Sequence, residues 1–306
     1  MSAVQCLSRI ALICRDVQTL ATFYEAAFDC VRADETAIAE SALSELLGLP
    51  NASARGLTLR LGEQAVELIE LHPAGRSYPQ GISARSPLFQ HFAIVVAGMD
   101  LAFARLSALA GWTAISIGGP QALPASSGGV TAYKFRDPEG HPLELIEFPS
   151  SSAPKHWQRK TAELFLGIDH SAISVASTAR SSGFYERLGL KRKSGSLNGG
   201  PAQDRLDGIA GAHVAVTALA FPGDTPPHLE FLCYDETGQE TPLPGINDVA
   251  ATRLVLTVES AETLNALCLR SAAACLSAPV RFADGSLRAL LRDPDGHLLC
   301  LQVSPE

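Results

Sequence analysis

One stretch near the middle of the chain constrains the fold most. Residues 135–148 read F-R-D-P-E-G-H-P-L-E-L-I-E-F, a turn followed by a short apolar strand. Residues 291–303 read L-R-D-P-D-G-H-L-L-C-L-Q-V, so the pattern recurs 156 positions later (293 minus 137). A turn and strand that recur in this way indicate an internal duplication. The copies differ inside the strand, where the first carries Glu144 and the second carries Cys300.

Hydrophobic periodicity predicts four similar modules, each with the order strand, helix and then further strands. In the first, a strand at 8–14 precedes a helix capped by Asp16, and strands follow near Val31 and at 57–61 and 65–71, after a helix-prone insertion at 38–47. The second has a strand at 91–96, a helix at 100–110 and strands at 112–117, 130–135 and 143–148. The third has strands at 170–175 and 228–234, and the fourth a strand at 253–258, a helix at 261–274 and a last strand that ends at Val303.

Corresponding positions of the two halves keep a nearly constant offset. Arg9 and His170 are 161 positions apart (170 minus 9), and His91 and Arg253 are 162 apart (253 minus 91). We therefore expect two domains. Residues 1–149 would hold modules at about 5–75 and 88–149, and residues 165–306 would hold modules at about 165–236 and 248–306. The polar, proline-containing residues 150–164 would link them.

The composition favours a small molecule as the partner. With 306 residues, 46% hydrophobic and 18% charged, the chain has enough apolar material for two cores. A net charge of −8 without a basic block argues against nucleic acid or an anionic membrane as the partner. The sequence shows no signal peptide and no apolar run long enough to span a membrane, and its seven scattered cysteines form no C-x-x-C pair. We expect a cytoplasmic protein with a small-molecule substrate, as a monomer or a homodimer.

With these features in view, the sequence resembles the vicinal oxygen chelate superfamily, which includes glyoxalase I, bleomycin resistance proteins and extradiol dioxygenases. The resemblance rests on the Phe-Tyr pairs at 23–24 and 184–185, the Asp-Pro-x-Gly-His turns at 137–141 and 293–297, and the module order. It implies an α+β fold in which four βαβββ modules form two glyoxalase-like domains with incompletely closed eight-stranded barrels.

The same resemblance implies metal ligands at the start of the first strand and in the middle of the last strand of each module. The residues at these positions are Arg9 and Glu67, His91 and Glu144, His170 and Glu230, and Arg253 and Cys300. If neighbouring modules pair, neither barrel has a complete ligand set. If modules pair in the crossed manner that resembles single-chain glyoxalase I, the second and third modules together supply His91, Glu144, His170 and Glu230.

Crossed pairing would bring the first and fourth modules together around Arg9, Glu67, Arg253 and Cys300. There the guanidinium groups would replace the positive charge of a metal ion beside Glu67. This predicts a degenerate second site and one divalent metal ion per chain. Two imidazoles and two carboxylates suit a divalent Ni, Co, Zn, Mn or Fe ion.

These residues favour an enzyme of the glyoxalase I or epimerase type, an isomerase or lyase that acts on a small substrate with vicinal oxygens through a metal-stabilised enediolate or oxyanion. Glu144 or Glu230 would transfer the proton. One alternative is a ring-cleaving dioxygenase with non-haem Fe(II) or Mn(II). Another is a metal-free protein that binds its ligand or confers resistance by sequestering it.

Other polar residues are expected to stabilise turns or to line the cleft. His141 and His297 follow the glycine of a turn, and we expect them to form hydrogen bonds there. Tyr133, Arg136, Asn198 and Gln203 lie near predicted strand ends and are expected to line the cleft.

Overall fold

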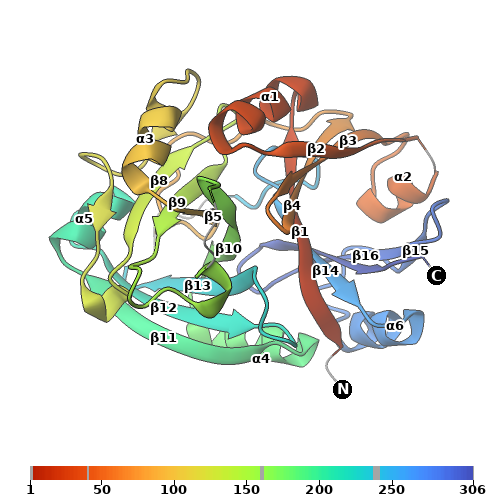
Figure 1. The fold of residues 1–306 in the computed structure, drawn as a ribbon. Coiled ribbons are helices and arrows are strands. Elements are labelled where there is room, and N and C mark those ends of the chain that lie inside the picture. The colour runs from red at the N-terminus through yellow and green to blue at the C-terminus, as the bar shows by residue number, and fades with distance from the viewer. Residues whose placement is uncertain (1–2, 40, 159–161, 237–241, 306) are drawn as a thin grey trace.

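The computed structural model describes residues 3–39, 41–158, 162–236 and 242–305. It confirms the α+β fold, with two curled sheets side by side and helices packed against them (Figure 1). Residue 40 of the predicted insertion, residues 159–161 of the predicted linker and residues 237–241 lie outside the described residues. The domain boundaries expected from the sequence stay a prediction.

Sheet A joins the first module to the fourth. Its eight strands run in the order β15-β16-β17-β14-β1-β4-β3-β2. The strands are β1 (Val4–Cys14), β2 (Val31–Ile38), β3 (Ser53–Leu61), β4 (Gln64–His72), β14 (Arg253–Val258), β15 (Val280–Arg281), β16 (Leu287–Arg292) and β17 (Leu298–Val303).

Sheet B joins the second module to the third, with nine strands in the order β11-β12-β13-β10-β5-β9-β8-β6 and β7 paired to β8. The strands are β5 (Gln90–Val96), β6 (Thr113–Ala114), β7 (Gln121–Ala122), β8 (Thr131–Arg136), β9 (Pro142–Glu147), β10 (Phe165–Ser174), β11 (Lys191–Gly199), β12 (His213–Ala220) and β13 (His228–Tyr234).

The modules therefore pair in the crossed manner. β1 lies antiparallel to β14, and β10 lies antiparallel to β5, so each sheet takes one module from each half of the chain. In both sheets the first strand of a module also lies parallel to that module's last strand. The two sheets thus repeat one strand arrangement.

The helices pack against the sheets, and α1 (Val17–Phe28), α4 (Thr178–Leu188) and α6 (Ala261–Arg270) each begin after a side chain that caps the first turn. α1 starts after Asp16, whose side chain accepts hydrogen bonds from the first-turn N–H groups, as predicted. Ser177 and Ser260 cap α4 and α6 in the same way. The remaining helical segments are α2 (Ser41–Leu47), α3 (Met99–Ser107), α5 (Pro201–Asp207) and the 3-10 turns η1 (Ala125–Ser127) and η2 (Lys155–Trp157).

Strand alternation separates the core from the concave faces. On β5, Phe92 and Ile94 belong to the main core together with helix residues such as Tyr24 and Tyr185, whereas His91 points to the opposite face. The exposed fraction of each of these four core side chains is 2% or less, and full burial of such a side chain contributes about 1.5–3 kcal/mol. Each sheet is therefore anchored on its helix side, and the opposite, concave side carries polar as well as apolar residues.

The duplicated turns hold neighbouring modules together. Tyr24 donates a hydrogen bond to Asp137 Oδ2 over 3.1 Å, and Tyr185 makes the same contact, also 3.1 Å, with Asp293 Oδ2. The motifs that identified the family therefore contact each other, away from the concave faces.

The histidines of these turns have the structural role that the sequence predicts. The backbone N–H of His141 donates to Asp137 Oδ1, and that of His297 donates to Asp293 Oδ1. Gly140, with φ of 100°, provides the left-handed conformation that the first turn needs.

Some predicted elements are shorter in the structure. The strand expected at 112–117 is limited to β6, because the N–H groups of Ile115 and Ser116 both bond to the Lys134 carbonyl, which breaks the ladder. The helices expected at 100–110 and 261–274 end at Ser107 and Arg270. The strand near Val31 is present as β2. None of the helices in the described ranges has the length and apolar character that a membrane crossing needs.

Candidate metal centre

The strand register of sheet B brings residues from four strands to one point. Ala172 on β10 lies opposite His91 on β5 and opposite Glu230 on β13. On the far side of β5, Ala93 lies opposite Glu144 on β9. Because residues opposite one another point to the same face, these three polar side chains converge on the concave side.

A β-bulge adds His170 to this group. Ile168 on β10 pairs with Ile94, and His170 pairs with Ala93, so Asp169 is an extra residue in the strand. Ile168 points into the main core, and without the bulge His170, two residues later, would face the core as well. The bulge reverses the alternation and turns the His170 imidazole to the concave face.

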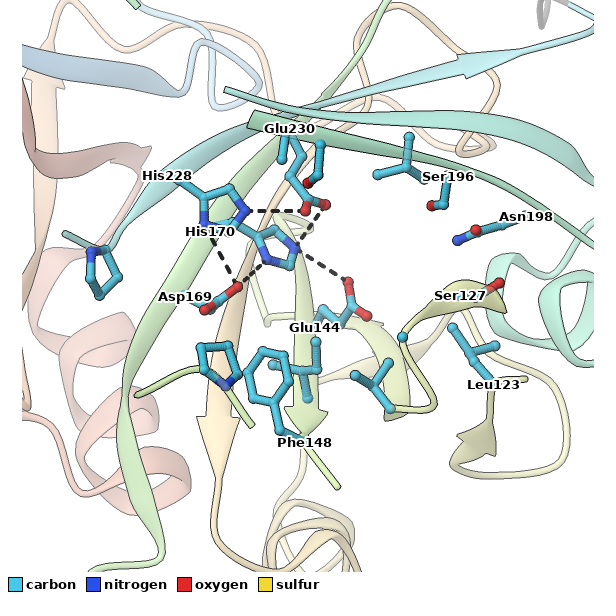
Figure 2. A pocket seen from close by; sticks show the side chains of 18 of the residues that line it. Leu123, Ser127, Glu144, Phe148, Asp169, His170, Ser196, Asn198, His228 and Glu230 are labelled. Carbon is cyan, nitrogen blue, oxygen red and sulfur yellow. Dashed lines mark hydrogen bonds and ion pairs between the residues drawn. The ribbon is translucent and has the colours of Figure 1, made fainter. Parts of the chain in front are cut away.

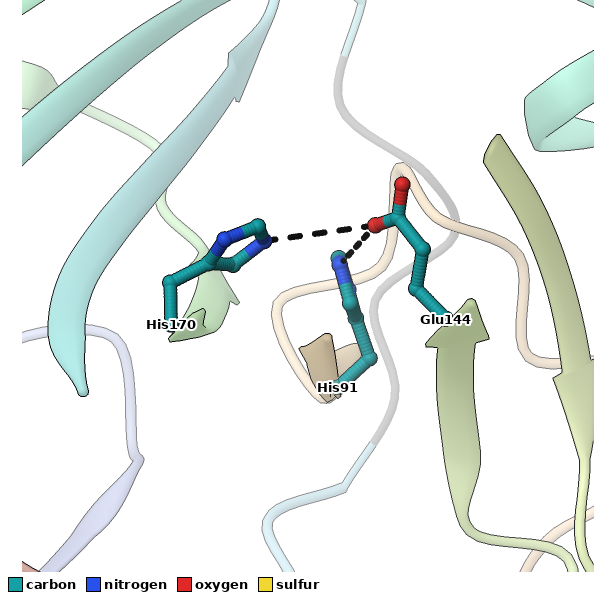
Figure 3. A group of neighbouring side chains, drawn as sticks. All are labelled: His91, Glu144 and His170. Atoms are coloured by element: carbon teal, nitrogen blue, oxygen red, sulfur yellow. Dashed lines mark hydrogen bonds and ion pairs between the residues drawn. The ribbon is translucent and has the colours of Figure 1, made fainter. Parts of the chain in front are cut away.

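The side chains that converge are close enough to share an ion. His91 Nε2 lies 2.8 Å from Glu144 Oε2, and His170 Nε2 lies 4.0 Å from the same oxygen (Figure 3). His170 Nε2 is also 3.6 Å from Glu230 Oε2. Ligands about 2.1 Å from one ion lie roughly 3–4 Å from each other, so this spacing suits a metal centre.

Two more residues, which the sequence analysis did not assign, support His170 and Glu230. Asp169 Oδ2 lies 3.0 Å from His170 Nδ1, while Asp169 Oδ1 accepts a hydrogen bond from Trp157 Nε1. His228 Nε2 lies 3.1 Å from Glu230 Oε1 (Figure 2). A carboxylate on the far nitrogen fixes the orientation of a ligand imidazole. The adjacent Asp-His pair at 169–170 was the available signal for this role.

A buried ion pair lies beside Glu144. Lys134 on β8 is the register partner of Glu144, and its Nζ lies 2.7 Å from Asp207 Oδ1. Asp207 Oδ2 also accepts hydrogen bonds from Gln203 Nε2 and the Tyr234 hydroxyl. No sequence pattern predicts this network, because the partner of Lys134 belongs to another module, 73 positions away.

These charges shift the pKa values of the histidines and carboxylates. Burial lowers the pKa of His91. Burial alone would also lower the pKa of His170, but the negative charge of Glu230 and the bond to Asp169 raise it to about 9. Burial alone would raise the pKa of Glu230, but His170 and His228 lower it to about 2. Without an ion, Glu230 is therefore ionised at neutral pH and His170 carries a proton, which His170 must release before its Nε2 can bind a metal ion.

The donor set fits a divalent ion. Two imidazole nitrogens and two carboxylates are ligands that Zn, Ni, Co, Mn and Fe accept. One ligand atom from each of His91, Glu144 and His170 lies within 4.8 Å of the others, and all three residues are buried. Asp169, His170 and His228 form a second such group around the shared His170. Among the described residues, both groups that fit an ion are in sheet B.

A cavity of about 400 Å³ opens over these residues, as Figure 2 shows. Its wall is partly apolar, from Leu123, Phe148 and Trp157, and partly polar, from Ser127 and Ser196. This size and mixture suit a small molecule.

Two of the four residues predicted from strand ends line this cavity. They are Asn198 and Gln203. The prediction for the other two is wrong. Tyr133 points into the main core, and Arg136 turns away to donate hydrogen bonds to the carbonyls of Gly140 and Ile82.

The equivalent face of sheet A has a different set of residues. Ala11 on β1 lies opposite Arg253 and Glu67, and Val255 lies opposite Cys300. The same register in sheet B places His91, Glu230 and Glu144. Arg9 Nε lies 2.6 Å from Glu67 Oε2, so a guanidinium group neutralises this carboxylate.

Comparisons with known proteins agree with this architecture. The model of the glyoxalase/bleomycin resistance protein/dioxygenase superfamily matches residues 7–145 and 167–301. Glyoxalase I from Zea mays is similar over 98% of this chain and 92% of its own, with 16% identity and a TM-score of 0.62. A candidate dioxygenase from Bacillus subtilis is similar over 100% of this chain and 87% of its own, with 14% identity and a TM-score of 0.60. At these identities the likeness shows the fold. A search of curated protein sequences found no match.

Proposed function

The chain belongs to the glyoxalase/bleomycin resistance protein/dioxygenase superfamily, and on that premise we propose that it is a metal-dependent enzyme of the glyoxalase I or epimerase type. It would act as an isomerase or lyase on a small molecule with adjacent oxygens. The observation that carries this proposal is the convergence of His91, Glu144, His170 and Glu230 at the floor of the sheet B cavity.

These four residues would hold one divalent ion, drawn from Ni, Co, Zn, Mn or Fe. Such an ion, when bound, polarises the substrate oxygens and stabilises the negative charge that develops on them. Asp169 holds the His170 ring by its Nδ1 atom, which leaves Nε2 directed at the carboxylates. The ligand geometry is therefore built before an ion arrives.

Proton transfer falls to one of the two glutamates. The Glu230 side chain is 19% exposed and borders the cavity, whereas the Glu144 side chain is 8% exposed and bonds to His91. A base must reach a substrate carbon, so the more accessible Glu230 is favoured for moving the proton, and Glu144 for holding the site together. His228, at 3.1 Å, orients the Glu230 carboxylate.

Solvent exchange tests this proposal directly. The protein loaded with each of the five metals is incubated in D2O with α-hydroxycarbonyl compounds and hemithioacetals, and deuterium at the carbon next to the carbonyl is followed by NMR. We expect exchange with at least one metal, and its loss in Glu230→Gln with the metal retained. Exchange that persists unchanged in Glu230→Gln would rule out the assigned base.

A second candidate is a ring-cleaving dioxygenase that uses Fe(II) or Mn(II). The group formed by Asp169, His170 and His228 has the two-histidine, one-carboxylate composition of non-haem iron oxygenases. Oxygen consumption with catechols and hydroquinones would favour this reaction over isomerisation. A stoichiometric ligand complex that needs no metal would instead favour a binding or resistance protein.

The proposal includes a small-molecule substrate and a cytoplasmic location. All seven cysteines are free thiols, which fits a reducing compartment. Whether the chain acts as a monomer or a homodimer is checked by light scattering.

A further inference from the structure

The concave face of sheet A holds a second cavity, smaller than that of sheet B. Its volume is about 50 Å³, and it lies between α2 and strands β1, β2, β3, β4, β14, β16 and β17. Charged residues at its wall are Arg9, Glu67, Arg253 and Arg288. Three guanidinium groups therefore face one carboxylate.

Arg253 is the unusual residue of this cavity. Only 6% of it is exposed, and its Nη2 donates to the Ile246 carbonyl over 2.6 Å. Its Nε is buried and has no hydrogen-bond partner. Burial lowers the pKa of Arg253, and the more distant Cys300 and Glu67 only partly oppose this effect. Such a charge is costly to bury unless an anion neutralises it.

The other two arginines already have anionic partners. Arg9 is paired with Glu67 at 2.6 Å and also donates to Gln302 Oε1. Arg288 is paired with Asp284 at 2.7 Å. Within the described ranges, Arg253 is thus the cavity arginine whose charge no carboxylate side chain meets within ion-pair distance.

Most of the remaining cavity wall is apolar, with Thr36 as a polar exception. α2 contributes Leu43 and Leu46, and the strands contribute Ile69, Leu71 and Leu290. A water needs roughly 10–15 Å³ of such volume, so the cavity has room for a carboxylate with a short hydrocarbon chain. Phosphate and sulfate would leave oxygens against the leucine side chains, at a cost in desolvation.

We propose that the concave face of sheet A binds a short-chain aliphatic carboxylate, whose anionic group meets the Arg253 guanidinium and whose hydrocarbon part packs under α2. A planar carboxylate matches the fork of a guanidinium group and supplies the acceptor that Nε lacks. This site is separate from the proposed metal centre and does not depend on the function proposed for it.

The Nε–Hε resonance of Arg253 reports on this contact without any substitution. Full-length protein labelled with 15N is titrated with butyrate and, as a neutral control, with butyramide, and the resonance is assigned with Arg253→Lys. We expect butyrate to shift this resonance in a saturable way and butyramide to leave it in place. A resonance that does not respond to butyrate would overturn the proposal.

Three variants show whether binding takes place at this cavity. By calorimetry, Arg253→Met is expected to weaken butyrate binding by roughly tenfold or more, because it removes the guanidinium group that would meet the carboxylate. His91→Ala, in the other sheet, and Arg55→Met, an exposed arginine on β3 paired with Glu35, should leave binding unchanged. Binding lost in His91→Ala and kept in Arg253→Met would overturn the proposal, because butyrate would then occupy the metal centre. If Arg253→Met does not fold, the response of the Arg253 Nε–Hε resonance to butyrate in the unaltered protein tests the proposal.

Discussion

The two concave faces of this molecule share a strand register and differ in chemistry. In sheet B the register positions carry imidazoles and carboxylates, and in sheet A they carry guanidinium groups, a thiol and one carboxylate. Arg253 stands where sheet B has His91, and Cys300 stands where it has Glu144. The backbone therefore supplies the positions twice, and the side chains decide whether a metal ion or an anion suits them.

The residues around these positions are also more polar in sheet B than in sheet A. Lys134 lies next to Glu144 in sheet B, whereas Leu290 lies next to Cys300 in sheet A. The sheet B cavity is about 400 Å³ with a polar floor, and the sheet A cavity is about 50 Å³ under the leucines of α2. Sheet B therefore has an open polar site where sheet A has a small, mostly apolar one.

The largest expected effect is the loss of metal from sheet B alone. His91→Ala and His170→Ala should each lower metal affinity by more than the roughly 10–100-fold that loss of a residue orienting a ligand costs. Arg253→Met, at the register position of His91, should leave affinity unchanged. Calorimetric titration with Ni(II) and Zn(II) checks all three, and a normal affinity in only one of the two histidine variants would contradict a site shared by both modules.

Grafting the sheet B ligands onto sheet A should create a second metal site. Arg9→His, Arg253→His and Cys300→Glu in one chain would place two imidazoles beside Glu67 and a new carboxylate. Because the two registers match, we expect metal content to rise by roughly one ion per chain. Inductively coupled plasma mass spectrometry measures this, and unchanged content would mean that register alone does not specify the site.

The buried ion pair of sheet B gives a smaller effect, on stability. Lys134→Leu would leave Asp207 buried without a cation and should lower the free energy of unfolding by about 3–5 kcal/mol. The double variant Lys134→Leu, Asp207→Leu, which copies the apolar wall of sheet A, should recover most of that loss. Urea denaturation followed by circular dichroism tests this, and equal losses in the single and double variants would refute the comparison.

The smallest expected effect is on the pH dependence of stability, and it should differ between the two duplicated turns. Burial alone would lower the pKa of His141, but the charge of Asp137, 2.8 Å from Nδ1, raises it. The resulting stabilisation is fully present below about pH 6.5 and is lost as the pH rises through the raised value of the folded state. In the His141→Gln variant the free energy of unfolding should not show this decrease with rising pH. The decrease expected in the unaltered protein is about 1.4 kcal/mol for each unit by which the pKa of His141 is raised.

The matched control is His297→Gln, because the ring of His297 bonds to the Ser174 carbonyl through Nε2. Thermal unfolding from pH 6 to pH 9 measures both variants. If the pH dependence of thermal unfolding is the same in His141→Gln as in the unaltered protein, the role assigned to the Asp137 contact is contradicted.

Most of the fold could be predicted because the repeated motifs are local. The Asp-Pro-x-Gly-His turns and the alternation of the last strands lie within a few residues, and the family follows from them. The sequence supports crossed pairing only indirectly, because that pairing alone brings two histidines and two glutamates together. The order of strands in the two sheets confirms it.

What the sequence could not show depends on register and distance. The direction of the His170 side chain depends on a bulge in β10, and the position of a one-residue bulge is not given by hydrophobic periodicity. Lys134 is placed in the site by Asp207, a residue of the third module. The polarity of the Arg253 cavity was anticipated, but its missing hydrogen-bond partner required the structure.

Metal analysis of the full-length protein purified without chelator tests the central claim most directly. We propose four metal ligands in sheet B and no complete set in sheet A, so we predict roughly one divalent ion per chain. Two ions per chain would show that sheet A also binds metal, and protein that takes up none of the five metals on reconstitution would contradict the metal centre itself.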